Sequence, residues 1–344
     1  MPAAPPKPVL NPADEALVNR WLHIRSNLST ATVSSYERAG RRLLLWCAEH
    51  KLVLAELTEA LVQKYFHHLR HPPAHWRVSR KVQAVDRTPT QVLYGPMSAR
   101  SLEQERILLL TLLTGLVDLG LLARNPVRQV PAPRSSKQSP ADKALSQEAW
   151  TTLRAWTDSL PHDTAGARLR WVVRLFYYTG LRRIEVRSGC MADFHPEDGQ
   201  WYLRVKGKFD KVRDITVPPP LLEALRAYRA SLGLASLPSP TDLEIPLIVP
   251  LTGNPRVLCL RRLNAIIDEL AKAASLAADN PYIAQELSAL TPHRFRHTNA
   301  THRLSKGATL ETVQDELGHS DPRTTRIYAK TRKEARIRDA NLLD

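Results

Sequence analysis

The stretch QWYLRVKGKFDKVRDITV, residues 200–217, predicts β structure more clearly than any other part of this sequence. Apolar and polar residues alternate along residues 200–206 and again along residues 212–217, which is typical of half-buried strands. Between them, residues 207–210 (GKFD) supply the glycine and the aspartate of a hairpin turn. We therefore expect an antiparallel hairpin that carries Lys208 at its turn.

Helical patterns occupy most of the chain on both sides of this hairpin. Apolar residues recur every three or four positions, and Ser, Thr or Pro stand where the patterns begin. The expected helices cover residues 13–28, a segment from Ser29 or Thr30 through Trp46, a segment from Thr58 through Leu69, and residues 99–122, 146–160, 165–179, about 220–232, 257–276, 294–305, 309–317 and 324–328. The expected fold is mainly α, with a helical N-terminal domain and a mixed α+β second domain that contains a small antiparallel sheet.

Segments rich in proline divide the chain. Residues 1–11 are expected to be disordered, and residues 12–126 to form the helical domain, interrupted by a loop or insertion at about 71–97. Residues 127–144 are rich in Pro, Ser and basic residues and predict an interdomain linker, followed by a second domain over residues 145–344. The linker either follows a phosphate backbone or is an inert spacer. The insertion either contacts DNA or protein or is a disordered loop.

The charge balance favours a polyanionic partner. The 344 residues include 49 Lys and Arg against 34 Asp and Glu, a net charge of +15. Such a surplus favours nucleic acid, because basic side chains that neutralise phosphates release condensed counterions. A solvated basic surface or a ribosome-associated protein would show the same surplus, so charge alone does not indicate an enzyme.

The cysteines and the N-terminus indicate a reducing compartment. Cys47, Cys190 and Cys259 lie far apart and predict buried apolar side chains rather than disulfides or metal ligands. The N-terminus lacks the apolar core of a signal peptide, and no apolar run approaches the roughly 18 residues of a membrane span. We expect a cytoplasmic protein with no membrane partner.

Four polar clusters could carry chemistry. In TGLRRIEV (179–186), Glu185 follows Arg182 by three residues, so its carboxylate could orient a guanidinium that binds two phosphate oxygens. In the hairpin turn, a lysine could protonate a leaving oxygen. Lys206, Lys208 and Lys211 compete for this role. On its own, each of these two clusters favours an ordinary surface feature, a surface Arg-Glu pair in the first and a solvent-exposed turn lysine in the second.

The other two clusters lie near the C-terminus. In TPHRFRHTNATHRL (291–304), His293 and Arg296 share a helix face, while His297 is expected to be a core histidine. A zinc site at His293 and His297 is disfavoured, because the glutamate of HExxH and a nearby cysteine are absent. In LGHSDPRTTRIY (317–328), His319 follows a helix end at Gly318, and Tyr328 comes nine residues later.

Together these clusters contain the groups that phosphoryl transfer without a metal requires. Cations stabilise the charge on the non-bridging oxygens, proton donors serve the leaving oxygen, and a hydroxyl attacks in line. The clusters include no group of carboxylates suited to catalysis by two metal ions.

The four motifs, in this order, resemble the tyrosine recombinase (phage integrase) family and its Xer-like site-specific recombinases. The resemblance covers residues 146–335, and the N-terminal region is more loosely similar to the family's SAM-like core-binding domain. It implies a DNA strand transferase that acts in integration, excision or resolution of mobile or chromosomal DNA. It also implies a 3′-phosphotyrosyl intermediate and a synaptic tetramer on double-stranded DNA, with no cofactor, metal or small-molecule substrate.

The resemblance also assigns roles by position. Arg182 and Arg296 would clamp the scissile phosphate, and Lys208 would protonate the departing 5′ oxygen. His293 would act as general acid and base, His319 would bind the phosphate, and Tyr328 would be the nucleophile. Two places depart from the family pattern. Phe209 follows the lysine where the family has glycine, and Arg183-Ile184 stands where the family often has a small residue before the acid.

Two rival functions remain at this point. A type IB topoisomerase shares the chemistry but relaxes supercoils as a monomer, without synapsis. A DNA-binding regulator on an inactive integrase scaffold would bind DNA without forming a covalent adduct.

Overall fold

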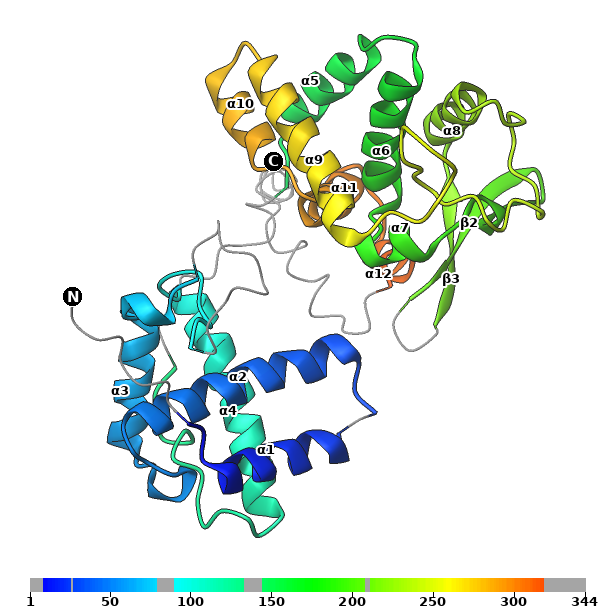
Figure 1. The fold of residues 1–344 in the computed structure, drawn as a ribbon. Coiled ribbons are helices and arrows are strands. Elements are labelled where there is room, and N and C mark those ends of the chain that lie inside the picture. Colours follow the sequence, from blue (N-terminus) through cyan, green and yellow to red (C-terminus); the bar gives the residue numbers. More distant parts are fainter. Residues whose placement is uncertain (1–8, 26, 79–89, 133–143, 208–210, 319–344) are drawn as a thin grey trace, which may run out of the picture. The chain divides into compact units, whose positions relative to one another are not determined.

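A computed structural model of the chain describes residues 9–25, 27–78, 90–132, 144–207 and 211–318. The chain divides into two compact units, Met1–Lys137 and Gln138–Asp344 (Figure 1). The predicted domain limits remain predictions, and each unit is described by itself. In the described part of the chain, no helix has both the length and the apolar character needed to span a membrane.

The first unit consists of helices packed around one apolar core. Its helices are α1 (Pro12–Ile24), α2 (Thr30–Glu49), α3 (Glu59–Arg70) and α4 (Ala99–Asp118), with short 3-10 turns at Leu54–Glu56 and Ala74–Trp76. Ser29, Thr58 and Ser98 cap α2, α3 and α4, because each side-chain oxygen accepts a hydrogen bond from a backbone N–H of the first turn. These starts agree with the sequence predictions.

Two predicted helix ends in this unit were wrong. α1 ends at Ile24 instead of residue 28, because Ser29 takes an extended backbone to cap α2 and the chain must turn before it. α4 ends at Asp118 instead of residue 122, because Gly120 adopts φ = 69° and the Leu121 N–H bonds back to the Leu116 carbonyl.

The second unit is helical with one small sheet. Its helices are α5 (Gln147–Asp158), α6 (Thr164–Thr179), α7 (Arg183–Ser188), α8 (Pro219–Ser231), α9 (Leu260–Leu276), α10 (Pro281–Ser288), α11 (Pro292–Ser305) and α12 (Leu310–Leu317). Its strands are β1 (Phe194–Glu197), β2 (Gln200–Lys206) and β3 (Val212–Val217). The order β1-β2-β3 is antiparallel throughout, so the predicted fold class, mainly α with a small antiparallel sheet, is confirmed.

Two elements, β1 and α10, were not predicted from the sequence. β1 is only four residues long and contains a proline, so no alternating pattern develops. The turn that follows it does carry a signal: Asp198 and Gly199 have φ of 47° and 77°, and Asp-Gly is a preferred pair for tight hairpins. α10 is short, and Asn280 caps it with Pro281 in the first turn.

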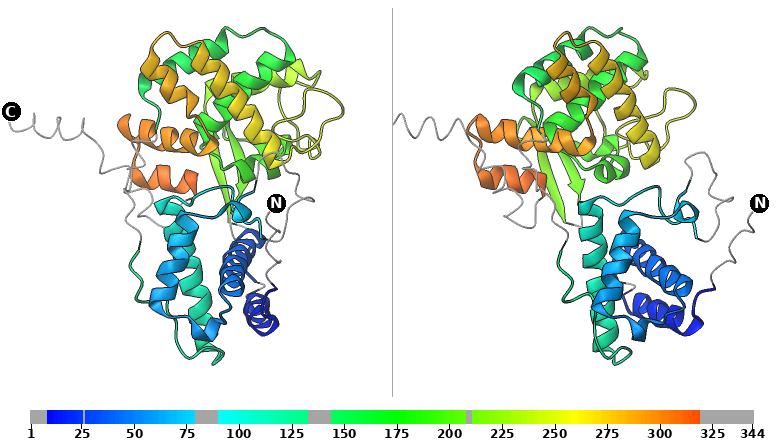
Figure 2. Two further views of the ribbon diagram at one scale, coloured as in Figure 1. Left: turned by 60° about the vertical axis from the view of Figure 1, so that its left-hand side comes forward. Right: turned by 90° about the vertical axis from the view of Figure 1, so that its left-hand side faces the viewer.

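The core of the second unit surrounds α6. This helix packs against α5, α8, α11 and β3 (Figures 1 and 2). Helix α10 packs against both α9 and α5. Trp171 of α6 is fully buried and donates from its indole N–H to the Leu247 carbonyl over 2.6 Å. The core therefore fixes the position of α6 and of Gly180 at its C-terminal end. The residues that follow Gly180 start from this fixed point.

The cysteine prediction was right for Cys47 and wrong for Cys259. Cys47 is buried in the first core, whereas Cys259 is exposed because it occupies the N-cap position of α9 at the surface. Cys190 is half-buried, and all three are free thiols.

Candidate active site

Three arginines converge on the C-terminal end of α12. A helix ends with carbonyl groups that lack partners within the helix, and these groups carry the negative end of the helix dipole. Here three successive carbonyls each accept from a different arginine. The pairs are Arg213 Nε to Glu316 O at 2.7 Å, Arg296 Nη2 to Leu317 O, and Arg182 Nη2 to Gly318 O at 3.3 Å.

Arg182 is the N-cap of α7 and is held by Glu185. Its backbone N–H donates to Glu185 Oε2 at 2.8 Å, and its Nη1 donates to Glu185 Oε1 at 2.9 Å. The predicted orientation of this guanidinium by Glu185 is therefore present in the structure. The side chain remains 39% exposed, which leaves room for an external anion.

Arg296 is buried between two helix ends. It lies on α11, which begins at Pro292 behind the N-cap Thr291, and only 3% of the residue is exposed. Its Nη1 donates to the Gly180 carbonyl at 2.9 Å, at the end of α6, while its Nη2 reaches the end of α12. A buried guanidinium fixed in this way is pre-oriented.

The end of α6 is a left-handed glycine that leaves no space for a side chain. Gly180 has φ = 58°, and a Cβ there would lie 2.5 Å from Cδ2 of Leu317 and 3.4 Å from the side chain of Asn299. The close approach of α6 and α12 that brings Arg182 and Arg296 to one place thus depends on this glycine.

Glu185 is the buried anion of the cluster. Its side chain is 3% exposed and accepts from Nη1 and Nη2 of Arg213 at 3.1 and 3.0 Å, in addition to Arg182. Burial raises the pKa of the carboxyl, but the hydrogen bonds and charge of Arg213, followed by those of Arg182, outweigh burial and hold this pKa below its usual value. Glu185 is therefore ionised at neutral pH and fixes two arginines at once.

The two histidines at the start of α11 differ in exposure. His293 is exposed, and His297, four residues on, is buried, as expected for a core histidine. Their rings lie edge to face with centroids 4.4 Å apart. Among the described residues, no three His, Cys, Asp or Glu side chains are grouped so as to hold a metal ion.

Lys208, His319 and Tyr328 lie outside the described residues, so their predicted roles stay predictions. Two of them, Lys208 and His319, directly follow described residues in the chain. Gly207 precedes Lys208 and its N–H bonds to the Lys211 carbonyl at 2.9 Å, and Gly318 precedes His319.

Arg213 is the member of this cluster that was not predicted from the sequence. The alternation of the strand does contain a signal for this residue, because Arg213 shares a face of β3 with the buried Ile215 and Val217. A charged residue on the buried face of a strand indicates a specific partner, since an unpaired buried charge is costly.

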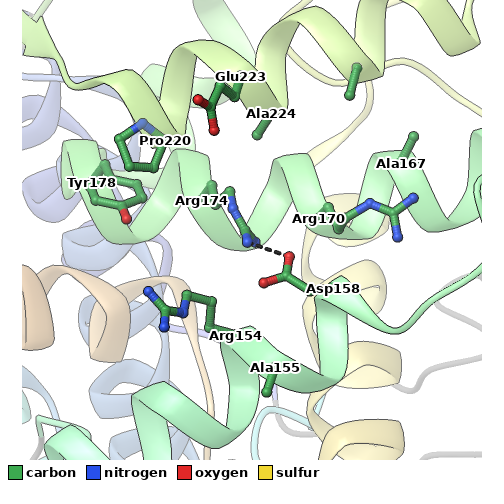
Figure 3. A pocket seen from close by; sticks show the side chains of 11 residues that line it. Arg154, Ala155, Asp158, Ala167, Arg170, Arg174, Tyr178, Pro220, Glu223 and Ala224 are labelled. Carbon is green, nitrogen blue, oxygen red and sulfur yellow. Dashed lines mark hydrogen bonds and ion pairs between the residues drawn. The ribbon is translucent and has the colours of Figure 1, made fainter.

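A cavity of about 410 Å³ lies elsewhere in this unit, between α5, α6 and α8 (Figure 3). Two of its arginines bind the end of α5 and the turn after it: Arg174 pairs with Asp158, and Arg170 donates to the Thr157, Leu160 and Pro161 carbonyls. The cavity contains none of the predicted site residues.

Known proteins have sequences similar to that of this chain. Residues 144–335 match the model of the phage integrase family. Tyrosine recombinase XerC of Mycobacterium sp. (strain KMS) is 31% identical over 210 residues, which is 61% of this chain and 64% of that relative. Tyrosine recombinase XerD of Halalkalibacterium halodurans is 28% identical over 327 residues, 94% of this chain and 95% of that relative.

Solved structures show the same fold. The XerH site-specific recombinase bound to palindromic difH substrate superposes with a TM-score of 0.67 at 18% identity, over 97% of both chains. The Tn1549 transposon integrase in complex with a circular intermediate DNA gives a TM-score of 0.66 at 14% identity, over 93% of this chain and 95% of that one.

Proposed function

The chain belongs to the phage integrase family, and on that premise we propose that it is a site-specific tyrosine recombinase. It cleaves and rejoins DNA strands through a 3′-phosphotyrosyl intermediate, in integration, excision or resolution. The observation that carries the proposal is the convergence of Arg182 and Arg296 on the end of α12, directly before His319 in the chain.

The two arginines provide the phosphate clamp. Attack on a phosphodiester increases negative charge on the two non-bridging oxygens, and fixed guanidinium groups stabilise that charge without reorganising. Arg296 is fixed by burial and Arg182 by Glu185, so both guanidinium groups are held before the substrate arrives. Loss of one such donor typically slows catalysis about 10²- to 10³-fold.

The remaining groups move protons. The hydroxyl oxygen of Tyr328 bonds to phosphorus as the bond from phosphorus to the 5′ oxygen breaks. His293 takes the tyrosine proton, Lys208 gives a proton to the departing 5′ oxygen, and His319 donates a hydrogen bond to the phosphate. One phosphodiester is exchanged for another, so the reverse attack by a 5′ hydroxyl rejoins DNA without ATP or a metal ion.

The proposed partners are double-stranded DNA and further copies of the chain in a synaptic tetramer. The net charge of +15 supports DNA binding. Among structural neighbours, XerH is bound to difH DNA after cleavage, and the lambda integrase forms a tetramer on a Holliday junction. Recombination joins two duplexes, each cut on two strands, which calls for four active sites. The proposed compartment is the cytoplasm, where the DNA is.

Covalent capture on DNA tests the proposal without knowledge of the target site. The full chain is incubated with host genomic DNA that carries random nicks, because a nick near the cleavage point lets the 5′-hydroxyl fragment diffuse away and traps the adduct. Protein that stays on DNA in strong denaturant is recovered and its DNA sequenced. We expect a covalent adduct on one shared sequence motif.

Two tyrosine variants serve as test and control. Tyr328→Phe should bind DNA and form no adduct, whereas Tyr282→Phe, at a tyrosine that is 78% exposed on α10, should match the wild type. An adduct with Tyr328→Phe would refute the assignment of the nucleophile. Adducts without a shared motif, together with relaxation of a supercoiled plasmid, would indicate a topoisomerase, and binding without any adduct would indicate a regulator.

A further inference from the structure

Arg213 of β3 contacts described residues that lie in or beside three of the four predicted motifs. Its guanidinium donates to both oxygens of Glu185 and to the Glu316 carbonyl, and its side chain is only 9% exposed. Through Glu185 it reaches the first arginine motif, and through Glu316 it reaches the helix that precedes His319 and Tyr328.

Two glycines pack against the same guanidinium. A Cβ on Gly318 would lie 3.1–3.2 Å from Nη1, Cζ and Nε of Arg213, and a Cβ on Gly207 would lie 3.2 Å from Nη1. Gly318 is the residue before His319, and Gly207 is the residue before Lys208. The guanidinium of Arg213 thus lies against the backbone at the points from which both segments depart.

We propose that Arg213 is a positioning residue for strand cleavage, which sets the geometry of Arg182, the lysine turn and the nucleophile-bearing segment relative to one another. The inference rests on the proposed function and adds a residue to it. In this role Arg213 acts through other residues, because its three nitrogens donate to Glu185 and to the Glu316 carbonyl.

The planar fork explains why an arginine is needed here. Two parallel N–H groups match the two oxygens of a carboxylate, while the Nε–H points along a different edge of the guanidinium toward a third acceptor. A lysine at this position has one nitrogen and cannot span Glu185 and the Glu316 carbonyl together. Displacements near 1 Å in an active site can slow catalysis by about 10²-fold.

The second unit offers a closely matched control. Arg229 of α8 is also buried, with a side chain that is 2% exposed, and it also joins one carboxylate to one backbone carbonyl. Its partners are Asp242 at 2.9 Å and the Ala235 carbonyl at 2.7 Å, and neither belongs to a predicted catalytic motif. A purely structural arginine should therefore behave like Arg229.

The experiment compares Arg213→Met, Arg213→Lys and Arg229→Met in the full chain, at a temperature where circular dichroism shows each to be folded. The wild-type target, identified by covalent capture, is used as a nicked duplex. The rate constant of adduct formation at saturating DNA and the Kd for DNA are measured separately. We expect Arg213→Met to lower the rate constant by about 10²-fold and to change Kd by less than about threefold.

The two other variants complete the test. Arg213→Lys should show a rate constant of about a tenth of the wild-type value, because lysine restores the positive charge beside Glu185 but lacks the planar fork of arginine. Arg229→Met should stay within about threefold of the wild type. Equal rate constants for Arg213→Met and Arg229→Met, or an effect of Arg213→Met on Kd alone, would overturn the inference.

A measurement without DNA separates this inference from the proposed function. If the wild type forms no adduct, the proposed function fails, and ¹⁵N NMR of the arginine guanidinium groups still tests the positioning role. The Arg182 signals, assigned with Arg182→Lys, should show hindered rotation in the wild type and in Arg229→Met, and free rotation in Arg213→Met. Unchanged Arg182 signals in Arg213→Met would overturn the inference.

Discussion

Arg182 and Arg296 donate hydrogen bonds to neighbouring carbonyl groups at the end of α12, those of Gly318 and Leu317. One arginine caps α7 and the other lies on α11, so the end of α12 is the element that brings them together. The next residue in the chain is His319. A shift of this helix end would move both guanidinium groups, which couples the predicted phosphate clamp to the segment carrying Tyr328.

Arg296→Lys should abolish most of the activity while leaving DNA binding largely intact. A lysine has no planar fork, so it cannot bridge the Gly180 and Leu317 carbonyls and also present donors to a phosphate. We expect the rate constant of covalent adduct formation to fall about 10²- to 10³-fold, measured on a nicked duplex at saturating DNA.

The control for this variant lies on the same helix. Arg294→Lys changes a half-buried arginine whose ion pair with Glu286 spans 3.9 Å, and it should stay within about threefold of the wild type. Equal losses for the two lysine variants would show that Arg296 has no special place in the reaction.

Gly180→Ala should destabilise the protein more than Gly233→Ala. Both glycines have positive φ, 58° and 72°, so both alanine variants carry a backbone cost of about 1–2 kcal/mol. Only at Gly180 does the added Cβ meet the buried Leu317, which adds about 1–3 kcal/mol of overpacking. Urea denaturation measures both free energies of unfolding, and equal values would mean that α12 moves aside without cost.

Alkylation should modify Cys259 first and leave Cys47 untouched in the folded protein. Cys259 is exposed, whereas burial, followed by the charge of Asp14, raises the pKa of the Cys47 thiol to about 12. Intact-mass analysis after brief treatment with iodoacetamide at pH 8 should show a fast adduct that disappears in Cys259→Ser. Rapid labelling of Cys47 would show that the first core opens readily.

The sequence predicted those features of the molecule that depend on near neighbours. Ser29, Thr58 and Ser98 signal helix starts because an N-cap acts within three residues, and the β2–β3 hairpin follows from alternation across one turn. The orientation of Arg182 by Glu185 was predictable for the same reason, since the two residues lie on successive turns.

The contacts that build the site were not predictable in this way. Arg213 meets the Glu316 carbonyl across 103 positions of sequence, and Arg296 meets Gly180 across 116. Such contacts depend on how α6, α11 and α12 pack, and no local pattern encodes that packing. β1 was missed for the opposite reason, because four residues are too few to display a period. The roles of Lys208, His319 and Tyr328 stay predictions based on family resemblance.

Glu185→Gln should remove a pH-dependent part of the stability. The pKa of the folded-state carboxyl lies below the ordinary value of 4.5, so ionised Glu185 stabilises the fold fully above about pH 4.5. This contribution is lost as the pH falls through the lower, folded-state pKa. At pH 7 the amide leaves the charges of Arg182 and Arg213 without their anion, and we expect a loss of about 3–5 kcal/mol.

Urea denaturation at pH 7 and at several values below pH 4.5 measures this effect. The free energies of unfolding of the wild type and of Glu185→Gln should differ most at pH 7 and converge as the solution is acidified, because the wild-type carboxyl then becomes neutral too. Asp193→Asn is a suitable control, since that carboxylate accepts from the Cys190 N–H in the same unit without an arginine partner among the described contacts. A difference between wild type and Glu185→Gln that stays constant with pH would mean that the shape of the side chain, and not its charge, fixes the two arginines.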